Sequence, residues 1–373
     1  MPKNAISIII PVFNAANTLP RVFSCLLAQS IGFERLEIVF ADDCSKDNSH
    51  ALLLQFASEH DNVRVVKTEA NSGVAGKARN LALKSVSSPY VMFLDADDSY
   101  TENACEILYN AIINSNADLV SGYAVRIDED GHLLKTDDYG GLAPRTTNLP
   151  QQLREELVLR DAFWCKIYKR AMIVDNDLHF LEGVPGEDIY FLYSYILCAA
   201  SAEYLAVPVY HYTMLESSVM HQPSASFYIG LGQAYREMQS LFAAKDAMWA
   251  FDLIVDQILQ SHLCGMADSR LMSQNDIAAS LPYWQWLFAF EKAQDTLCAS
   301  PVAAALWPFI ETQDWQAAAA ALRALAPLRN AQSEAQNELA RWQKHARDLQ
   351  NTLDAMRNSR IWRMTHPGKR GQK

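Results

Sequence analysis

The chain lacks any apolar run long enough to cross a bilayer, although half of its 373 residues are hydrophobic. A membrane-spanning helix needs about 20 consecutive apolar residues, so the sequence predicts peripheral membrane contact at most. The first residues also lack the basic, apolar and small-residue order of a secretory signal. We therefore expect a cytoplasmic protein.

Paired cysteines and excess positive charge are lacking as well. The seven cysteines are odd in number, scattered along the chain and never spaced as CxxC, which fits reduced thiols better than a disulfide framework. The formal net charge is -11. Nucleic-acid binding depends on clustered Lys and Arg, so this balance argues against it.

The first hundred residues alternate apolar, β-branched runs with amphipathic segments. Strands are expected at 6–10, 37–40, 63–66 and 90–94, and helices at 18–29, 47–59 and 75–86. This order predicts the α/β class, a mostly parallel, Rossmann-like sheet with helices on both faces. Ligands bind beyond the carboxyl ends of such strands. Asn14, Asp42, Asp43, Asp95 and Asp97 each follow a strand, so we expect them on one rim.

The rest of the chain predicts three parts. The catalytic domain is expected over 1–222, a helical domain over 223–329, and an amphipathic or coiled-coil helix with a basic tail over 330–373. The segment 330–357 has apolar residues spaced by three and four, as in a helix that packs on the body or on a second copy.

Asp95 and Asp97 leave the fourth predicted strand together. Their hard oxygen ligands suit Mg²⁺ or Mn²⁺, which a diphosphate leaving group needs for charge neutralisation. As an alternative, Asp98 or Ser99 caps a helix that begins near Thr101. Capping leaves the other two acids unexplained, because they repel one another unless a cation or a donor joins them.

Two further strand ends carry polar clusters. Asp42 and Asp43 can accept a hydrogen bond from the imide of uracil, or can form a capped turn. The segment from Asn71 to Asn80 has two glycines and two basic residues, and a helix start favours anionic groups. The alternative for that segment is a flexible turn in which Arg79 pairs with a surface acid.

Glu187 and Asp188 open an apolar helix. Acids in the first turn of a helix are common because of the helix dipole. An inverting sugar transfer also requires one carboxylate to deprotonate the acceptor hydroxyl. Asp188 is the candidate for that base.

In this order the motifs resemble the family 2 glycosyltransferases, which have a GT-A fold, over roughly residues 5 to 220. The segments that carry the resemblance are Ile10-Pro11-Val12-Phe13-Asn14, Ala41-Asp42-Asp43-Cys44-Ser45, Asn71-Ser72-Gly73, Ala78-Arg79-Asn80, Phe93-Leu94-Asp95-Ala96-Asp97-Asp98, Trp164-Cys165-Lys166-Ile167-Tyr168-Lys169-Arg170 and Glu187-Asp188.

The resemblance implies a metal-dependent inverting transfer of a sugar from a nucleotide sugar, a UDP-sugar, to a glycan or lipid-linked acceptor in cell-surface polysaccharide synthesis. Asp97 and Asp95 would hold Mg²⁺ or Mn²⁺, and Asp188 would act as the base. The residues implied to bind the nucleotide sugar are Pro11, Phe13, Asn14, Asp42, Asp43, Asn71, Gly73, Arg79, Asp95 and Glu187.

The chain departs from the family after the strand that ends near Tyr212. Relatives often have arginines there, whereas this chain reads Thr213-Met214-Leu215-Glu216-Ser217-Ser218. A usual contact to the diphosphate is therefore missing. The basic side chains that could replace it are His211, His221, Lys166 and Lys169.

The end of the chain, Ser359-Arg360-Ile361-Trp362-Arg363-Met364-Thr365-His366-Pro367, resembles a signature at the tails of bacterial surface-polysaccharide transferases. A Trp among arginines suits the headgroups of an anionic membrane and predicts contact with its inner face. A disordered basic tail is the alternative.

Two other functions remain open at this point. The run from Phe93 to Asp97 also resembles the nucleophile strand of haloacid-dehalogenase-type phosphatases, although Asp98 and Ser99 follow it here. The missing arginines instead favour a non-catalytic, transferase-like module that binds partners through 330–357.

Overall fold

The structure of the protein is a computed structural model that describes residues 4–136, 145–148, 162–215, 224–268, 272–293 and 301–325. The boundary near 222, His221 and the whole segment 330–373 lie outside these residues.

The first half of the chain builds the parallel part of one sheet. Its strands are β1 (Ile6–Val12), β2 (Leu36–Asp42), β3 (Val63–Lys67) and β4 (Tyr90–Phe93), in the order β3-β2-β1-β4. The connecting helices are α1 (Leu19–Leu27), α2 (Ser49–Glu59) and α3 (Gly76–Leu83). These elements confirm the predicted order of strands and helices, and with it the α/β class.

The sheet continues with strands from later in the chain. These are β9 (Lys166–Lys169), β6 (Leu119–Ile127), β10 (Ser201–Thr213) and β5 (Ser99–Tyr100), with β7 (Leu133–Thr136) beside β6 and β8 (Arg145–Asn148) beside β10. β9 runs antiparallel to β4 and β6. The accompanying helices are α4 (Ala104–Ser115), α6 (Arg170–Asp175) and α7 (Glu187–Cys198).

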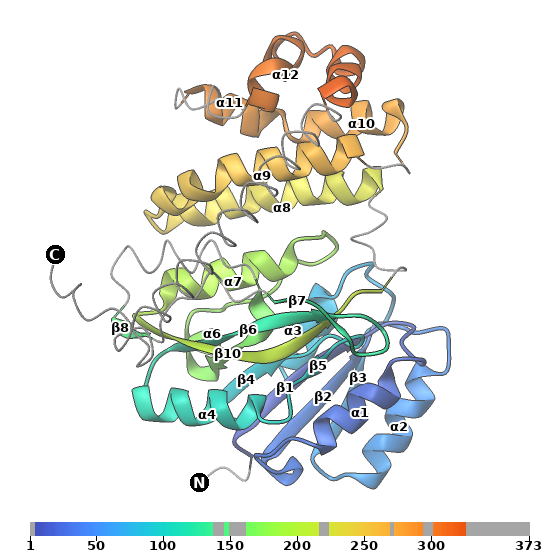
Figure 1. Ribbon diagram of the computed structural model, residues 1–373, viewed down its shortest axis with the longest axis vertical. Helices are drawn as coiled ribbons and strands as arrows, with labels where there is room; N and C mark the ends of the chain where they lie inside the picture. Colours follow the sequence, from blue (N-terminus) through green and yellow to red (C-terminus); the bar gives the residue numbers. More distant parts are fainter. Residues whose placement is uncertain are drawn as a thin grey trace, which may run out of the picture.

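The central strands are buried on both faces, which explains why they read as unbroken apolar runs. Neighbouring residues face opposite sides: Ile9 belongs to the core beneath α3 and α7, and Ile8 and Ile10 belong to the core beneath α1, α2 and α4. Figure 1 shows α7 above the sheet and α1, α2 and α4 below it.

The remaining described helices form a strandless layer beyond α7 (Figure 1). They are α8 (Ala225–Ala244), α9 (Met248–Asp268), α10 (Gln274–Ser280), α11 (Gln285–Ala293) and α12 (Pro301–Glu311). Tyr193 of α7 and Phe242 of α8 lie 5.7 Å apart between ring centroids, so this layer shares its apolar core with α7. None of the helices in the described ranges is long and apolar enough to span a membrane.

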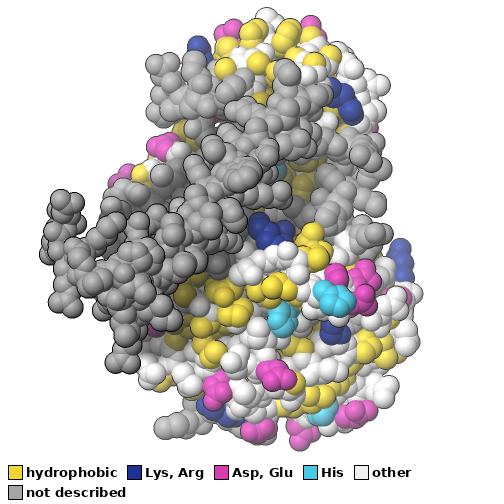
Figure 2. Space-filling view, viewed as in Figure 1, with side chains coloured by type: hydrophobic (Ala, Val, Ile, Leu, Met, Phe, Trp, Pro, Cys, Tyr) yellow, Lys and Arg dark blue, Asp and Glu magenta, His cyan; other side chains and the backbone are white. Residues whose placement is uncertain are grey.

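On the described part of the face drawn in Figure 2, acidic side chains gather along the lower edge and on the right, and apolar side chains lie between them. Within the described residues of this face, Lys and Arg side chains lie singly among Asp and Glu and form no continuous basic patch.

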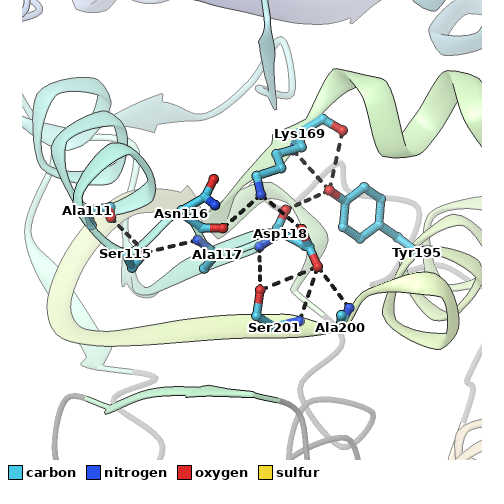
Figure 3. A network of polar contacts seen from close by, with 9 residues as sticks. All are labelled: Ala111, Ser115, Asn116, Ala117, Asp118, Lys169, Tyr195, Ala200 and Ser201. Atoms are coloured by element: carbon cyan, nitrogen blue, oxygen red, sulfur yellow. Dashed lines mark hydrogen bonds and ion pairs between the residues drawn. The ribbon is translucent and has the colours of Figure 1, made fainter.

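A polar network fixes α7 at the sheet end opposite the carboxyl ends of β1, β2 and β4 (Figure 3). Asp118 precedes β6, and its carboxylate accepts hydrogen bonds from Lys169 Nζ (3.0 Å) and from the backbone N–H groups of Ala200 (2.8 Å) and Ser201 (3.1 Å). The Tyr195 hydroxyl of α7 donates to the Asp118 carbonyl at 2.6 Å. The network thus joins β6, β9, β10 and α7.

Replacing Asp118 with Ala leaves the Lys169 ammonium and two N–H groups without their acceptor. We expect the free energy of unfolding to fall by about 2 kcal/mol, the cost of leaving such groups unsatisfied. Urea denaturation measures this change. Asp61→Ala, at an exposed turn, is the control and should stay within about 0.5 kcal/mol of the parent protein; equal stabilities of the two variants would contradict the role of the network.

Candidate active site

The loops after β1 and β2 are joined by Asn14. Its Oδ1 accepts a hydrogen bond from the N–H of Lys46 at 2.7 Å, and its own N–H donates to Ser45 Oγ at 3.0 Å. Asn14 has a φ of 50°, a left-handed conformation that Asn tolerates. Pro11 is buried in β1, whereas Phe13 is 45% exposed. The predicted residues Pro11, Phe13 and Asn14 therefore lie together, with an aromatic face open to a ligand.

Asp42 has a mainly structural environment. Its carboxylate is fully buried and contacts Lys67 Nζ (3.2 Å), His50 Nδ1 (3.0 Å) and the N–H of Ser45 (2.9 Å). Burial alone raises the pKa of Asp42, but the hydrogen bonds from Ser45 and Lys67 outweigh it and lower the pKa. The group is held as a carboxylate inside the turn.

Asp43 organises the loop that follows β3. Its carboxylate accepts hydrogen bonds from Thr68 Oγ1 (2.7 Å), Asn71 Nδ2 (3.0 Å) and both the N–H and the Oγ of Ser72 (2.9 Å each). Asn71 in turn accepts from the N–H of Gly73, whose φ of +80° requires glycine. The predicted residues Asp43, Asn71 and Gly73 thus form one rim beside Asp42.

Arg79 of α3 bridges two segments that are distant in sequence. Its Nη2 lies 2.7 Å from Asp95 Oδ1, and its Nη1 lies 3.0 Å from Glu187 Oε1. The guanidinium carbon lies 4.7 Å from the ring centroid of Phe163 and 5.3 Å from that of Phe180, within cation–π range. Arg79 is buried, so the alternative of a flexible turn with a surface ion pair is wrong.

The acidic loop after β4 carries unbalanced negative charge. The Asp95 side chain is 26% exposed. Burial, followed by the charge of Asp95, raises the pKa of Asp97 to about 6. A cation between the two carboxylates would relieve this repulsion, and their oxygen atoms match the preference of Mg²⁺ and Mn²⁺. Asp95 and Asp97 therefore fit the predicted metal-binding role.

The alternative that Asp98 or Ser99 caps a helix beginning near Thr101 is wrong. The buried Asp98 carboxylate accepts hydrogen bonds from the Tyr210 hydroxyl (2.8 Å) and from the N–H of Thr213 (2.7 Å). The Tyr210 oxygen accepts the N–H of Asp95 at 3.2 Å. Ser99 lies in β5, and α4 begins only at Ala104. Asp98 therefore fastens the end of β10 to the acidic loop.

Glu187 and Asp188 form the first turn of α7, as predicted. Gly186 at the helix start has a φ of +86°. Burial, followed by the negative charge of Glu187, raises the pKa of Asp188 to about 7. A carboxyl group that titrates near neutrality is suited to act as a general base.

Close packing sets the distance between α3 and the segment that leads to α7. A Cβ at Gly76 would lie 1.9 Å from the carbonyl oxygen of Leu181 and 3.2 Å from Glu187 Cγ. Only glycine fits there. The glycine thus permits a close backbone approach within the protein, which brings Glu187 to Arg79.

The basic side chains proposed to replace the missing arginines differ in position. Lys169 pairs with Asp118 at the opposite end of the sheet, so its proposed contact with the diphosphate is wrong. Lys166 is fully buried and its Nζ donates to the carbonyl of Ala162 at 2.5 Å. His211 lies at the rim, with Nδ1 3.4 Å from Ser99 Oγ.

A half-open cavity of about 640 Å³ lies on the outer side of α3. Its lining includes Asn80, Lys84, Arg170 and Glu182. Neither Asp97 nor Asp188 lines it. The candidate active site is therefore the rim with its acidic groups.

Most of the predicted rim residues lie in a segment that matches one protein family. Residues 7–175 match the sequence model of Glycosyl transferase family 2. This segment has the sequence of a family 2 glycosyltransferase domain. The match favours a glycosyltransferase over the haloacid-dehalogenase-type phosphatase, and the parallel strands with their helices agree with the GT-A fold that the sequence predicts.

Several curated glycosyltransferases are similar to this family 2 chain. The uncharacterized glycosyltransferase YibD of Escherichia coli K12 is 29% identical over 58% of this chain and 63% of its own length. The poly(ribitol-phosphate) beta-glucosyltransferase of Bacillus spizizenii is 27% identical over 60% of this chain and 35% of its own length. The chain thus spans under two thirds of both relatives.

The solved structures show the same fold over a longer stretch. TarS 1–349 of Staphylococcus aureus, crystallised in complex with UDP-GlcNAc, superposes with a TM-score of 0.64 at 20% sequence identity. The superposition covers 87% of this family 2 chain and 92% of that structure. The likeness therefore extends beyond the matched family segment into the helical layer.

Replacing Arg79 with Met leaves Asp95 and Glu187 without their shared partner. We expect the free energy of unfolding to fall by about 3 kcal/mol, because breaking a buried ion pair strands a charge. The double variant Arg79→Met with Glu187→Gln should recover part of this loss. Urea denaturation measures both, with Lys84→Met, at an exposed position that follows α3, as the control. A loss no larger than that of the control would contradict the bridge.

Proposed function

We propose that this family 2 glycosyltransferase moves a sugar, with inversion, from a UDP-sugar to a glycan or lipid-linked acceptor in cell-surface polysaccharide synthesis. The Arg79 bridge carries the proposal. It joins Asp95, in the acidic loop, to Glu187, whose neighbour Asp188 has a pKa of about 7. The loop proposed to bind the donor and the helix turn that carries the proposed base are thereby held together by the ion pairs of Arg79.

Several observations support a nucleotide-sugar donor. The similar structure of TarS is named as a complex with UDP-GlcNAc, and another as a complex with UDP. In this chain Phe13 offers an exposed aromatic ring beside the Asp43 loop. We propose that the nucleotide lies along this rim, with Pro11, Asn14, Asn71 and Gly73 shaping it and the diphosphate directed toward Asp95. Asp42 supports the loop from inside.

The transfer follows from the two acidic groups. Asp188 accepts the proton of the acceptor hydroxyl, and that oxygen forms a bond to the anomeric carbon of the sugar. The bond from that carbon to the diphosphate oxygen breaks on the opposite face, and the electron pair remains on the diphosphate. Asp188 then releases its proton to water. A single displacement of this kind inverts the anomeric configuration.

Asp95 and Asp97 would hold Mg²⁺ or Mn²⁺. The bound cation would neutralise charge on the departing diphosphate. Arg79 orients the Asp95 carboxylate through their ion pair. Asp98 and Tyr210 fix the main chain of the same loop through the N–H of Asp95.

We also propose the wider setting that the sequence predicts. The transferase domain would end near 222 and the helical domain near 329. The segment 330–373 would provide membrane contact at the cytoplasmic face and oligomer contacts. Deleting 330–373 is expected to weaken vesicle binding while donor hydrolysis is retained.

Asp188→Asn removes the base but keeps the shape of the side chain. We expect sugar transfer to fall by about 10³-fold, within the usual range for loss of general base catalysis. The dissociation constant of UDP in the presence of Mn²⁺, measured by calorimetry, should stay within about twofold of that of the parent protein, because Asp188 lies outside the proposed nucleotide contacts. Full transfer activity in the variant would exclude Asp188 as the base.

The pH dependence of transfer reports the same group. Asp188 acts as a base only when it is deprotonated, and its pKa is about 7. We therefore expect kcat/KM to rise about tenfold per pH unit below pH 7 and to level off above it. Between pH 6 and 7, above the pKa of about 6 of Asp97, the residual activity of Asp188→Asn should lack this rise. A flat profile of the parent protein between pH 5 and 8 would contradict the assignment.

Asp97→Ala removes a carboxylate from the acidic loop. Metal-dependent UDP binding and transfer are expected to be lost, while metal-independent binding of uridine remains, because the base and ribose contacts lie elsewhere on the rim. Calorimetry with and without Mn²⁺ separates the two. UDP binding by the parent protein without any transfer across a broad donor panel would instead support the non-catalytic alternative.

A further inference from the structure

Arg21 reaches the acidic loop from the side opposite to Arg79. It is the third residue of α1, and its Nη2 donates a hydrogen bond to the main-chain carbonyl of Asp97. Its Nε is buried and has no hydrogen-bond partner. Arg79, by comparison, approaches from α3 and binds the Asp95 side chain. One arginine from each side of the sheet therefore holds the loop.

The position of Arg21 is unfavourable for the helix itself. The first turn of a helix has a partial positive charge, so a cation there opposes the helix dipole. The first turn of α1 contains no acidic residue that could offset Arg21. A compensating interaction must come from outside the helix, and the acidic loop provides it.

On the other side of the loop, the described residues that end β10 include no Lys or Arg, and Arg126 of the neighbouring strand β6 lies over the Tyr212 ring, 5.6 Å from its centroid. Thr213 contacts Asp98 through its main-chain N–H, and Met214 and Leu215 follow. Lys169 lies at the far end of the sheet. Arg21 is thus placed where it can supply a function that the end of β10 does not.

We propose that Arg21 is a positioning residue of the metal-binding loop. Its hydrogen bond fixes the Asp97 main chain, and thereby the direction in which the Asp97 carboxylate meets the divalent cation. The proposal rests on the proposed function of this site. A charge-assisted hydrogen bond is directional and stronger than a neutral one, so it can hold the loop against the repulsion between Asp95 and Asp97.

Two effects of Arg21 on the cation have opposite signs, and this makes the proposal testable. As a positioning group it strengthens metal binding. As a nearby positive charge it weakens metal binding through repulsion. Removing Arg21 therefore weakens the binding of Mn²⁺ if positioning dominates, and strengthens it if only the charge matters.

The experiment is a titration of the full chain with Mn²⁺ alone, in which electron paramagnetic resonance measures the concentration of free Mn²⁺. Arg21→Met removes both charge and donor, Arg21→Gln keeps a donor, and Arg21→Lys keeps both. We expect Arg21→Met to weaken Mn²⁺ binding by about tenfold, which corresponds to about 1.4 kcal/mol. Arg21→Lys should stay within about threefold of the parent protein, with Arg21→Gln between them.

Lys84→Met, which removes an exposed cation after the end of α3, is the matched control and should leave Mn²⁺ binding unchanged. Thermal unfolding checks that each variant is folded. If Arg21→Met does not fold, the comparison of Arg21→Gln with Arg21→Lys replaces it, with weaker binding expected for Gln.

Unchanged or tighter Mn²⁺ binding in folded Arg21→Met or Arg21→Gln would overturn the role of Arg21 and leave the proposed function intact. A parent protein that binds no Mn²⁺ would overturn both the metal site and this inference. Kinetics provide a second readout: the Mn²⁺ concentration that gives half-maximal transfer should rise in Arg21→Met, whereas KM for the acceptor should not.

Discussion

Arg79 is buried, and a guanidinium cannot give up its charge in a protein interior. It must therefore be paired, and the two carboxylates that pair with it come from Asp95 and Glu187, 16 and 108 residues along the chain. A buried charge without a partner costs several kcal/mol. This cost ties the end of β4, the start of α3 and the start of α7 into one arrangement.

Contacts at both ends of α7 stabilise that arrangement. At the start of the helix, Gly76 allows α3 to approach Leu181 closely enough for Arg79 to reach Glu187. Near its other end, Tyr195 is anchored to Asp118 at the end of the sheet opposite the rim. The helix therefore has little freedom to shift along the sheet, and Asp188 keeps a fixed place relative to the acidic loop. A general base needs this precision, because a proton transfers only over hydrogen-bond distance.

Strand periodicity and the rule for parallel sheets were sufficient to predict the rim from the sequence. Asn14, Asp43, Asp95 and Asp97 do follow neighbouring strands, since the register of β1 with β2 and β4 brings these ends together. The sequence also predicted Arg79 and Asp188 as site residues, and the structure places Arg79 in contact with Asp95 and with Glu187, the neighbour of Asp188. The different environments of Asp42 and Asp43 were not predictable, because both acids follow the same strand and only the tertiary contacts of Lys67 and Asn71 distinguish them.

Other contacts of the site join residues that no local pattern connects. Asp98 and Tyr210 lie 112 residues apart, and Arg21 and Asp97 lie 76 apart. The third acid of Asp95-Ala96-Asp97-Asp98 was a possible signal for a structural carboxylate, but its partner on β10 becomes evident only once β10 has its place in the sheet. Lys169 shows the reverse error: it lies only three residues from Lys166, yet β9 runs antiparallel to β4 and carries Lys169 away from the rim.

The central claim is that the rim around the Arg79 bridge binds the donor and its cation. The most direct measurement is a crystal structure of the protein with UDP and Mn²⁺, in which anomalous scattering locates the metal. The account predicts one Mn²⁺ between the carboxylates of Asp95 and Asp97, with the diphosphate beside it and Asp188 facing the open side. A metal bound instead at the exposed cluster of Asp128, Asp130 and His132, or UDP bound in the cavity beside Lys84 and Arg170, would contradict it.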